Sequence, residues 1–519
     1  MGTQRNGFKK ESYILSVDVG TTSIRCHVYD KEAKVEGPAP LRRTGIPFHN
    51  FITWQDRRAA ELAKSWNRSC TMKAVHGVMK VLYFLSRQKR CMAASLIVFS
   101  HQHVTLRLVW VLDHYKQIRQ AVSEGNCCFG TIDTWLLFKL TKGHVHATDY
   151  SNASATGFFD TYQMCWSEFL CSMVSLPLSI LPTVENTNHD FGSTDISIFG
   201  EPIPIRSLMA DQQAAMFGEC CFDVGDVKIT MGTGTFMDIH TGCKPHTSIA
   251  GLYPLVGWKF GAEVVYLAEG NAADTGTAIK WAQELNLFED VKETSDLADS
   301  VPDSDGVCFV PSFSGLQAPM NDPKACASFM GLKPSTTKCH LVRAILESIV
   351  FRNKQLYETM LRETQIPVTK IRVDGGVSSN DFVMQLTADL FGRKVARPDH
   401  CEMSCLGAAY VAGLAVGFWK SKEELKKLQS TDKVFLPQRP RKDQDYHSLL
   451  HSWERALKRS MNCFQHGLKI IISRFCEFLI RITSSRTALS EIDCDTTGPD
   501  DANAWMVEAK SSRAEKNPA

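Results

Sequence analysis

The sequence predicts an α/β protein that contains two related domains. Two β-hairpins share one design, over 13–29 and 228–239, and each turn is rich in glycine and threonine. After Gly331 the pattern alternates between helix and strand, which is typical of α/β folds. With 519 residues the chain is also too long for a single core. Together these observations predict two or three domains, two of which open with a similar hairpin.

The individual elements follow from local patterns along the chain. Short apolar or alternating runs flank each glycine- and threonine-rich turn, which predicts paired strands. Apolar residues at helical spacing predict helices between the hairpins and after Gly331. The predicted helices cover 105–120, 340–364, 381–390 and the closely packed 406–417, and a predicted strand over 370–373 ends in a turn at 374–376.

The bulk composition is typical of a soluble globular protein, with 44% hydrophobic and 22% charged residues. A net charge of +2 gives no electrostatic reason to expect nucleic acid or an anionic membrane as partner. No apolar signal segment precedes the first strand, so we expect a cytoplasmic protein whose 18 cysteines are reduced. The most apolar long stretch, 468–482, is short and carries charged residues, so no membrane span is predicted.

The two hairpin turns are the candidate phosphate sites. The chain has no G-x-x-x-x-G-K-S/T loop and no G-x-G-x-x-G at a strand-to-helix turn. The first turn, with Thr21 and Thr22, offers backbone N–H and hydroxyl donors to phosphate oxygens. Asp18, at the end of the preceding strand, can hold a hydrated Mg²⁺. Either turn alone is more simply an ordinary hairpin, but both together, with DGGVSSN at 374–380, favour phosphate binding.

Seven motifs follow one another along the chain. They are DVGTTSIR at 18–25, GTIDTWLL at 130–137, TDYSNAS at 148–154, ADQQAAMFG at 210–218, MGTGTF at 231–236, ASFMGL at 327–332 with HLVRAILE at 340–347, and DGGVSSN at 374–380. In this order they make the chain resemble the FGGY carbohydrate kinases, and within them the glycerol kinases. The overall pattern is similar to that of the divergent glycerol kinase-like proteins of animals, and it runs from about residue 12 to residue 461.

This resemblance implies two actin-like (RNase H-like) α/β domains with ATP and a polyol in the cleft between them. The expected N-terminal domain covers 11–218 and the C-terminal nucleotide-binding domain covers 219–463. The stretch 464–519 resembles nothing in the family, and we expect it to be a disordered tail.

Asp211 is the residue that the resemblance implies as catalytic base. A primary alcohol is a poor nucleophile near neutral pH, and a nearby carboxylate can take its proton during attack on the γ-phosphorus. A simpler interpretation is that Asp211 caps the helix beginning at Gln212. Both roles are compatible with one side chain.

The resemblance also assigns residues to ATP, Mg²⁺ and the polyol. Lys280 stands where relatives often have glutamine, and Trp54 has the alternative of a core tryptophan. The implied phosphate contacts are Thr21, Thr22, Arg25 and Thr233, the implied nucleotide residues are Gly276, Lys280, Gly376 and Asn380, the implied polyol contacts are Asp211, Gln212, Trp54 and Phe236, and the implied metal ligand is Asp18.

The chain departs from the family pattern in its N-terminal domain. The region 31–47 is too short for the expected strand–helix–strand unit, and the Arg-Glu motif that grips polyol hydroxyls in the family is missing. Gln102 stands near the position of the substrate-facing tyrosine. With the atypical tail, these departures suggest an alternative splice product or an imperfect gene model.

Three functions therefore stay open at this point. The first is an active glycerol kinase that makes glycerol 3-phosphate and ADP. The second is a kinase-derived protein that binds nucleotide or a partner without phosphoryl transfer, and the third is a kinase for another polyol or sugar. We expect a small-molecule substrate as the main partner, while the sequence leaves homo-oligomerisation open.

Overall fold

The computed structural model describes residues 13–19, 24–31, 33, 35–38, 52, 56–100, 102–400, 402–438 and 443–463. They belong to one compact unit, which ends at Cys463. The first turn with Thr21 and Thr22, the tryptophan Trp54, and the predicted tail 464–519 lie outside the described residues.

A mixed seven-stranded sheet holds the second predicted hairpin. β8 and β9 pair in antiparallel fashion from Val227↔Ile239 to Met231↔Thr235, and β14 pairs in parallel with β8. The strand order is β10–β11–β9–β8–β14–β15–β16. The strands are β8 (Asp226–Met231), β9 (Thr235–Gly242), β10 (Tyr253–Phe260), β11 (Glu263–Ala272), β14 (Lys370–Asp374), β15 (Val395–Arg397) and β16 (Lys433–Phe435).

Strand alternation gives this sheet two different faces. Val227, Ile229 and Met231 of β8 pack into one large core with the helix α13 (Lys338–Thr364). Because successive side chains of a strand point to opposite faces, Lys228 and Thr230 lie on the other face. The other helices that share the α13 core are α11 (Gly276–Glu284), α12 (Thr294–Asp299), α14 (Asp381–Phe391) and α17 (Asp443–Ser460).

The first predicted hairpin also forms. β1 (Ile14–Val19) and β2 (Ile24–Tyr29) pair from Ile14↔Tyr29 to Val19↔Ile24. A short third strand, β3 (Val35–Pro38), pairs with β2, so part of the shortened 31–47 region is strand. The predicted helix over 105–120 is instead two helices, α4 (Val104–His114) and α5 (Lys116–Ser123), because Tyr115 adopts an extended backbone between them.

The remaining described elements are short helices and two-stranded sheets. No described helix is long and apolar enough to cross a membrane. The helices are α1 (Ala60–Arg68), α2 (Cys70–Ser86), α3 (Lys89–Ser95), α6 (Ile132–Leu140), α7 (Tyr150–Ser154), α8 (Glu168–Met173), α9 (Ile196–Phe199) and α16 (Lys422–Leu428), and the paired strands are β4 (Ala147–Asp149) with β7 (Thr183–Glu185), β5 (Phe159–Asp160) with β6 (Cys165–Trp166), and β12 (Cys308–Val310) with β13 (Ser328–Met330).

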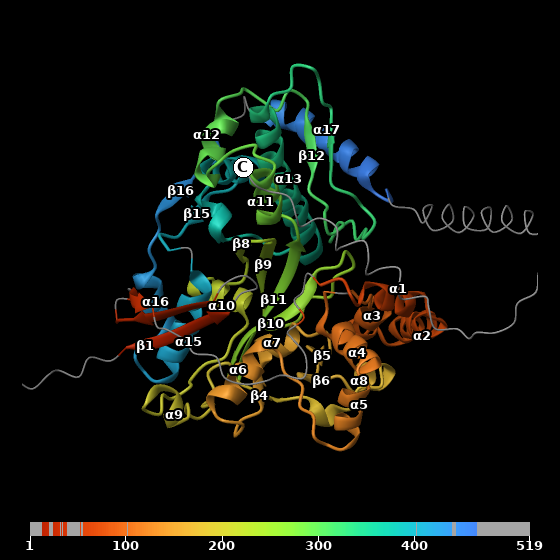
Figure 1. Ribbon diagram of the computed structural model, residues 1–519, viewed down its shortest axis with the longest axis vertical. Coiled ribbons are helices and arrows are strands. Elements are labelled where there is room, and N and C mark those ends of the chain that lie inside the picture. Colours follow the sequence, from red (N-terminus) through yellow and green to blue (C-terminus); the bar gives the residue numbers. More distant parts are fainter. Residues whose placement is uncertain are drawn as a thin grey trace, which may run out of the picture. The chain divides into compact units, whose positions relative to one another are not determined.

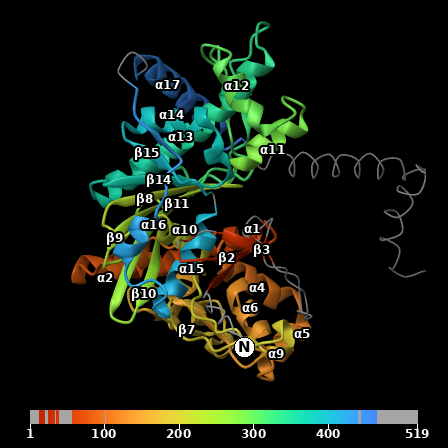
Figure 2. The ribbon, with the colours of Figure 1, turned by 90° about the vertical axis from the view of Figure 1, so that its left-hand side faces the viewer.

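Two helices cross closely next to the first hairpin: α10 (Asp211–Gly218) and α15 (Met403–Ala415). A Cβ atom on Gly407 would lie 1.7 Å from the Ala214 carbonyl oxygen, and one on Gly218 would lie 2.3 Å from the Met403 carbonyl oxygen. Figures 1 and 2 both show α15 beside α10 and the first hairpin. The crossing therefore requires glycine on both helices, and it places the start of α10 near β1.

The first hairpin takes its own core partners from the C-terminal part of the chain. Tyr29 and Ala33 are buried in one cluster with Tyr410 and Trp419. The Trp419 indole N–H donates to the Lys31 carbonyl oxygen at 2.8 Å. The hairpin and α15 are thus parts of a single core.

We predict that Gly407→Ala destabilises the protein by about 3 kcal/mol, because overpacking a backbone contact forces the helices apart. The measurement is the free energy of unfolding from denaturant titration. Gly77→Ala is a matched control, since Gly77 is an exposed position inside α2 with no atom within 4 Å of the added Cβ. That control should gain about 0.5–1 kcal/mol from helix propensity. Equal stability of Gly407→Ala and wild type would contradict the role given to this crossing.

Candidate active site

One cavity of about 2060 Å³ brings together many of the predicted site residues. This volume exceeds the range of about 300–1,000 Å³ that is usual for one small ligand, and it leaves room for a nucleotide and a polyol together. The predicted residues that line it are Asp18, Arg25, Asp211, Gln212, Thr233, Phe236 and Gly376.

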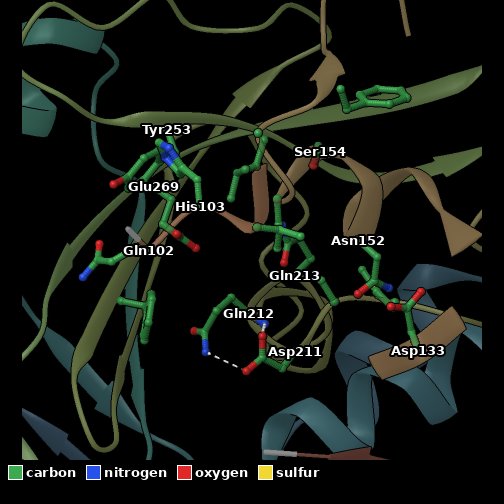
Figure 3. Close-up of a pocket in the computed structure, with 18 of the residues that line it drawn as sticks. Gln102, His103, Asp133, Asn152, Ser154, Asp211, Gln212, Gln213, Tyr253 and Glu269 are labelled. Carbon is green, nitrogen blue, oxygen red and sulfur yellow. Dashed lines mark hydrogen bonds between the residues drawn. The ribbon is translucent and has the colours of Figure 1, made fainter. Parts of the chain in front are cut away.

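The Asp211 carboxylate stands at the first residue of α10, and the residue is exposed in the cavity. Its Oδ1 accepts from the Gln212 backbone N–H at 2.8 Å, and its Oδ2 accepts from Gln212 Nε2 at 3.3 Å (Figure 3). The N-cap residue of α10 is Ala210, so the helix begins one residue earlier than the capping interpretation required. Asp211 therefore contacts the first turn and still presents its carboxylate to the cavity.

Asp18 and Arg25 face each other across the first hairpin, where they are paired in register. Arg25 Nη1 lies 3.4 Å from Asp18 Oδ2, and Arg25 Nε lies 2.7 Å from Glu402 Oε2. Burial, and then the nearby Asp211 carboxylate, raise the pKa of Asp18 to about 6. Two carboxylates that raise each other's electrostatic energy favour a cation between them.

The chemistry of Asp18 and Asp211 fits a bound Mg²⁺. Mg²⁺ prefers carboxylate oxygens and usually completes its shell with water and substrate phosphates. Among the described residues, no group of three or more acidic, histidine or cysteine side chains is arranged to hold a metal ion. A metal bound by Asp18 and Asp211 would therefore need phosphate oxygens and water as its other ligands.

The second hairpin turn is tightly supported from behind by α11. The Gly276 N–H donates to the Gly232 carbonyl oxygen at 3.0 Å, and the Thr275 and Thr277 N–H groups both donate to the Thr233 carbonyl at 3.2 Å. A Cβ on Gly276 would lie 2.6 Å from the Gly232 oxygen. Gly276 does not line the cavity, but it contacts the turn that carries Thr233.

The predicted nucleotide residues separate into two groups. Gly376, after the end of β14, lies in the cavity wall with no atom within 4 Å of an added Cβ. Asn380 is the N-cap of α14, where its Oδ1 accepts from Val383 N–H at 3.0 Å and its Nδ2 donates to Thr294 Oγ1 at 2.9 Å. Lys280 is exposed and lies 4.0 Å from Glu284. Asn380 and Lys280 do not line this cavity.

Sequence reasoning missed a group of polar residues on another wall of the cavity. Figure 3 shows Glu269, Tyr253 and His103 close together, with Gln102 beside them. The His103 and Tyr253 rings meet edge to face at 5.5 Å. Burial, and then the carboxylate of Asp238, raise the pKa of Glu269 well above its ordinary value. One signal in the sequence marks it, namely a single acid that directly follows the run VVYLA at 264–268 and interrupts the interior of β11.

Family models of known proteins identify the class to which this fold belongs. The family model for the N-terminal domain of the FGGY family of carbohydrate kinases matches residues 36–218, and that for the C-terminal domain matches residues 227–416. The chain belongs to the FGGY family of carbohydrate kinases, and it has the two-domain α/β fold of that family.

Within this family the chain is similar to animal proteins named glycerol kinase 5. It is 66% identical to the Danio rerio protein over 526 aligned positions, which include 89% of this chain and 99% of the relative. It is 55% identical to the Homo sapiens protein, with 87% of this chain and 96% of the relative aligned. The crystal structure of Plasmodium falciparum glycerol kinase with ADP matches with a TM-score of 0.75 and 27% identity, over 88% of this chain and 99% of that one.

We predict that Gly376→Ala weakens ATP binding about tenfold without loss of stability. The added methyl group meets no protein atom, so folding is unaffected, but it enters the part of the cavity expected to hold the nucleotide. A clash worth about 1.4 kcal/mol changes the dissociation constant tenfold. Calorimetric titration with ATP measures the effect, and Gly77→Ala again serves as the control with an equally open Cβ position. Unchanged affinity would place the nucleotide elsewhere.

Proposed function

We propose that this protein is an ATP-dependent kinase that phosphorylates glycerol to glycerol 3-phosphate, with Asp211 as the general base. The observation that carries the proposal is the position of Asp211. Its exposed carboxylate shares one cavity with Asp18, the Thr233 turn and Gly376. The names of the similar animal proteins and the ADP in the similar Plasmodium falciparum structure support this choice of substrates.

Asp211 acts on the hydroxyl group that attacks. Its carboxylate takes the proton of a primary alcohol while the alcohol oxygen bonds to the γ-phosphorus and the bond from that phosphorus to the β–γ bridging oxygen breaks. ADP leaves with the bridging oxygen. General-base help of this kind contributes about 10²–10⁴ in rate. Gln212 and Phe236 would bound the polyol beside Asp211, and Trp54 is proposed to complete this wall.

The remaining predicted residues would hold and neutralise the triphosphate. Asp18 would hold Mg²⁺, which would neutralise phosphate charge when bound. Arg25, the Thr233 turn and the first turn with Thr21 and Thr22 would donate to phosphate oxygens. Gly376 would lie against the nucleoside, with Gly276 supporting the Thr233 turn, while contacts from Lys280 and Asn380 require a nucleotide that extends beyond the described cavity.

We propose the same domain limits and location as the sequence predicts. The N-terminal domain covers 11–218, the C-terminal domain covers 219–463, and 464–519 is a tail, all in a cytoplasmic protein. The matched family regions 36–218 and 227–416 fit within these limits.

We also propose that the N-terminal domain lacks a segment near 31–47 and that turnover by this chain is weak or absent. The alignment with the Danio rerio relative has 526 positions, but it includes only 89% of the 519 residues of this chain. The surplus positions are gaps in this chain, so the relative carries residues that have no counterpart here. The missing polyol-gripping Arg-Glu motif supports the same view. The second candidate function, a nucleotide-binding or partner-binding protein without transfer, rests on this observation.

Replacing Asp211 by asparagine should lower the kcat of glycerol-dependent ADP release by about 10²–10⁴, because the amide cannot accept the proton. The assay measures ADP release from Mg-ATP with and without glycerol. Asp299→Asn is the matched control, since Asp299 is exposed near the end of α12 and does not line the cavity. Full activity of Asp211→Asn would remove Asp211 from the mechanism.

Grafting the extra residues of the Danio rerio relative into the 31–47 region should raise glycerol-dependent kcat/KM by about 10²-fold or more, since contacts to substrate hydroxyls return. A flexible Gly/Ser insert of the same length is the control and should give no gain. Ordinary glycerol kinase rates for the chain as it stands would refute the proposed impairment.

A further inference from the structure

Four charged or ionisable residues stand side by side across the sheet. Glu269 of β11 is paired with Asp238 of β9, Asp238 with Lys228 of β8, and Lys228 with Arg372 of β14. Cross-strand partners project to the same face, so these side chains form a row. This is the face opposite the α13 core, because Val227 and Ile229 of β8 point into that core.

The row is buried, and its charges compensate one another. The side chains of Lys228 and Asp238 are both 0% exposed, with Lys228 Nζ 2.8 Å from Asp238 Oδ2. Burial alone would lower the pKa of Lys228, but the carboxylates of Asp238 and Asp374 raise it, so the ammonium keeps its proton. A buried charge is tolerated when it is paired and hydrogen-bonded.

The row holds α10 at both of its ends. At the first turn, Lys228 Nζ donates to Gln212 Oε1 at 2.6 Å. At the last turn, Arg372 Nε donates to Glu219 Oε2 at 2.6 Å, a residue that directly follows α10. α10 is therefore fixed against the sheet by two polar contacts: a buried one to Glu219, and a part-buried one to Gln212, which lines the cavity.

The contact with Lys228 decides which way the Gln212 amide faces. An ammonium group has three donors and no acceptor, so its partner must be the amide oxygen. The amide nitrogen of Gln212 then points away from Lys228, and it lies 3.3 Å from Asp211 Oδ2. Without Lys228, only the longer contact with Asp211 would favour this amide orientation over the flipped one.

We propose that Lys228 is a positioning residue that acts through Gln212, fixing the amide so that its N–H₂ group faces the Asp211 carboxylate and the polyol. Asp238 keeps the ammonium in place. This inference rests on the proposed kinase function. Lys228 itself does not line the cavity, so it touches no substrate.

A double-mutant cycle between Lys228 and Gln212 tests the proposal. Because removal of Lys228 alone leaves Asp238 as an unpaired buried charge, the change is made as the neutral pair Lys228→Met with Asp238→Asn. In the wild-type background this pair should lower kcat/KM for glycerol about 10- to 100-fold, the loss expected for a charge-assisted hydrogen bond, with KM for ATP unchanged. In a Gln212→Ala background the same pair should change kcat/KM for glycerol by less than about twofold, since its route of action is already gone.

The contact between Arg372 and Glu219 at the other end of α10 supplies the matched control. Arg372→Met with Glu219→Gln removes the contact at the far end of the helix, and its effect should add to that of Gln212→Ala. If the Lys228 pair is equally harmful with and without the Gln212 side chain, or if KM for ATP rises in parallel, Lys228 is a structural residue and the proposal is wrong.

The design separates this inference from the proposed function. If wild type turns over glycerol, additive losses overturn the Lys228 proposal alone. If wild type binds glycerol in the presence of Mg-ADP without turnover, the double-mutant cycle is measured as the dissociation constant of glycerol, by calorimetry. The same criteria of additivity then apply. If wild type neither turns over nor binds glycerol, the proposed function fails and this inference fails with it.

Discussion

The close crossing of α10 and α15 is the constraint on which the site depends. Gly218 and Gly407 let the two backbones meet where any Cβ would collide with a carbonyl oxygen. α10 begins at Asp211, and α15 packs with the hairpin that carries Asp18. Because both carboxylates are fixed relative to this crossing, the distance between the proposed base and the proposed metal ligand is set by backbone packing rather than by flexible side chains.

Polar contacts with the sheet also fix the position of α10, in addition to the glycine crossing with α15. Beside apolar contacts such as Phe217 with Trp258, the sheet presents a row of charged side chains to α10, and Gln212 and Glu219 bond to Lys228 and Arg372 of this row. Replacing such contacts by apolar packing often costs no stability. In this protein the contact with Lys228 fixes the orientation of the Gln212 amide, which an apolar side chain in place of the lysine could not do.

Much of the fold could be predicted because its signals are local. Both hairpins follow from glycine and threonine between short apolar runs, and the helices α13, α14 and α15 follow from apolar spacing. The candidate site residues were predicted from motifs, and the structure places Asp18, Asp211 and Thr233 around one cavity. The row from Glu269 to Lys228 could not be predicted, because its members meet through pairing of strands that are far apart in the sequence. The break at Tyr115 was missed because the apolar spacing suggests one continuous helix, although the backbone at Tyr115 is extended and ends the first helix.

The shared core of the first hairpin bears on how the chain is synthesised. Tyr29 and Ala33 are buried against Tyr410 and Trp419, which the ribosome adds almost 400 residues later. Domains usually fold as they emerge, beginning with the N-terminal one. Here β1 and β2 lack these core partners until residue 419 has been synthesised, so the nascent chain must keep the two strands apart from other strand edges over this interval.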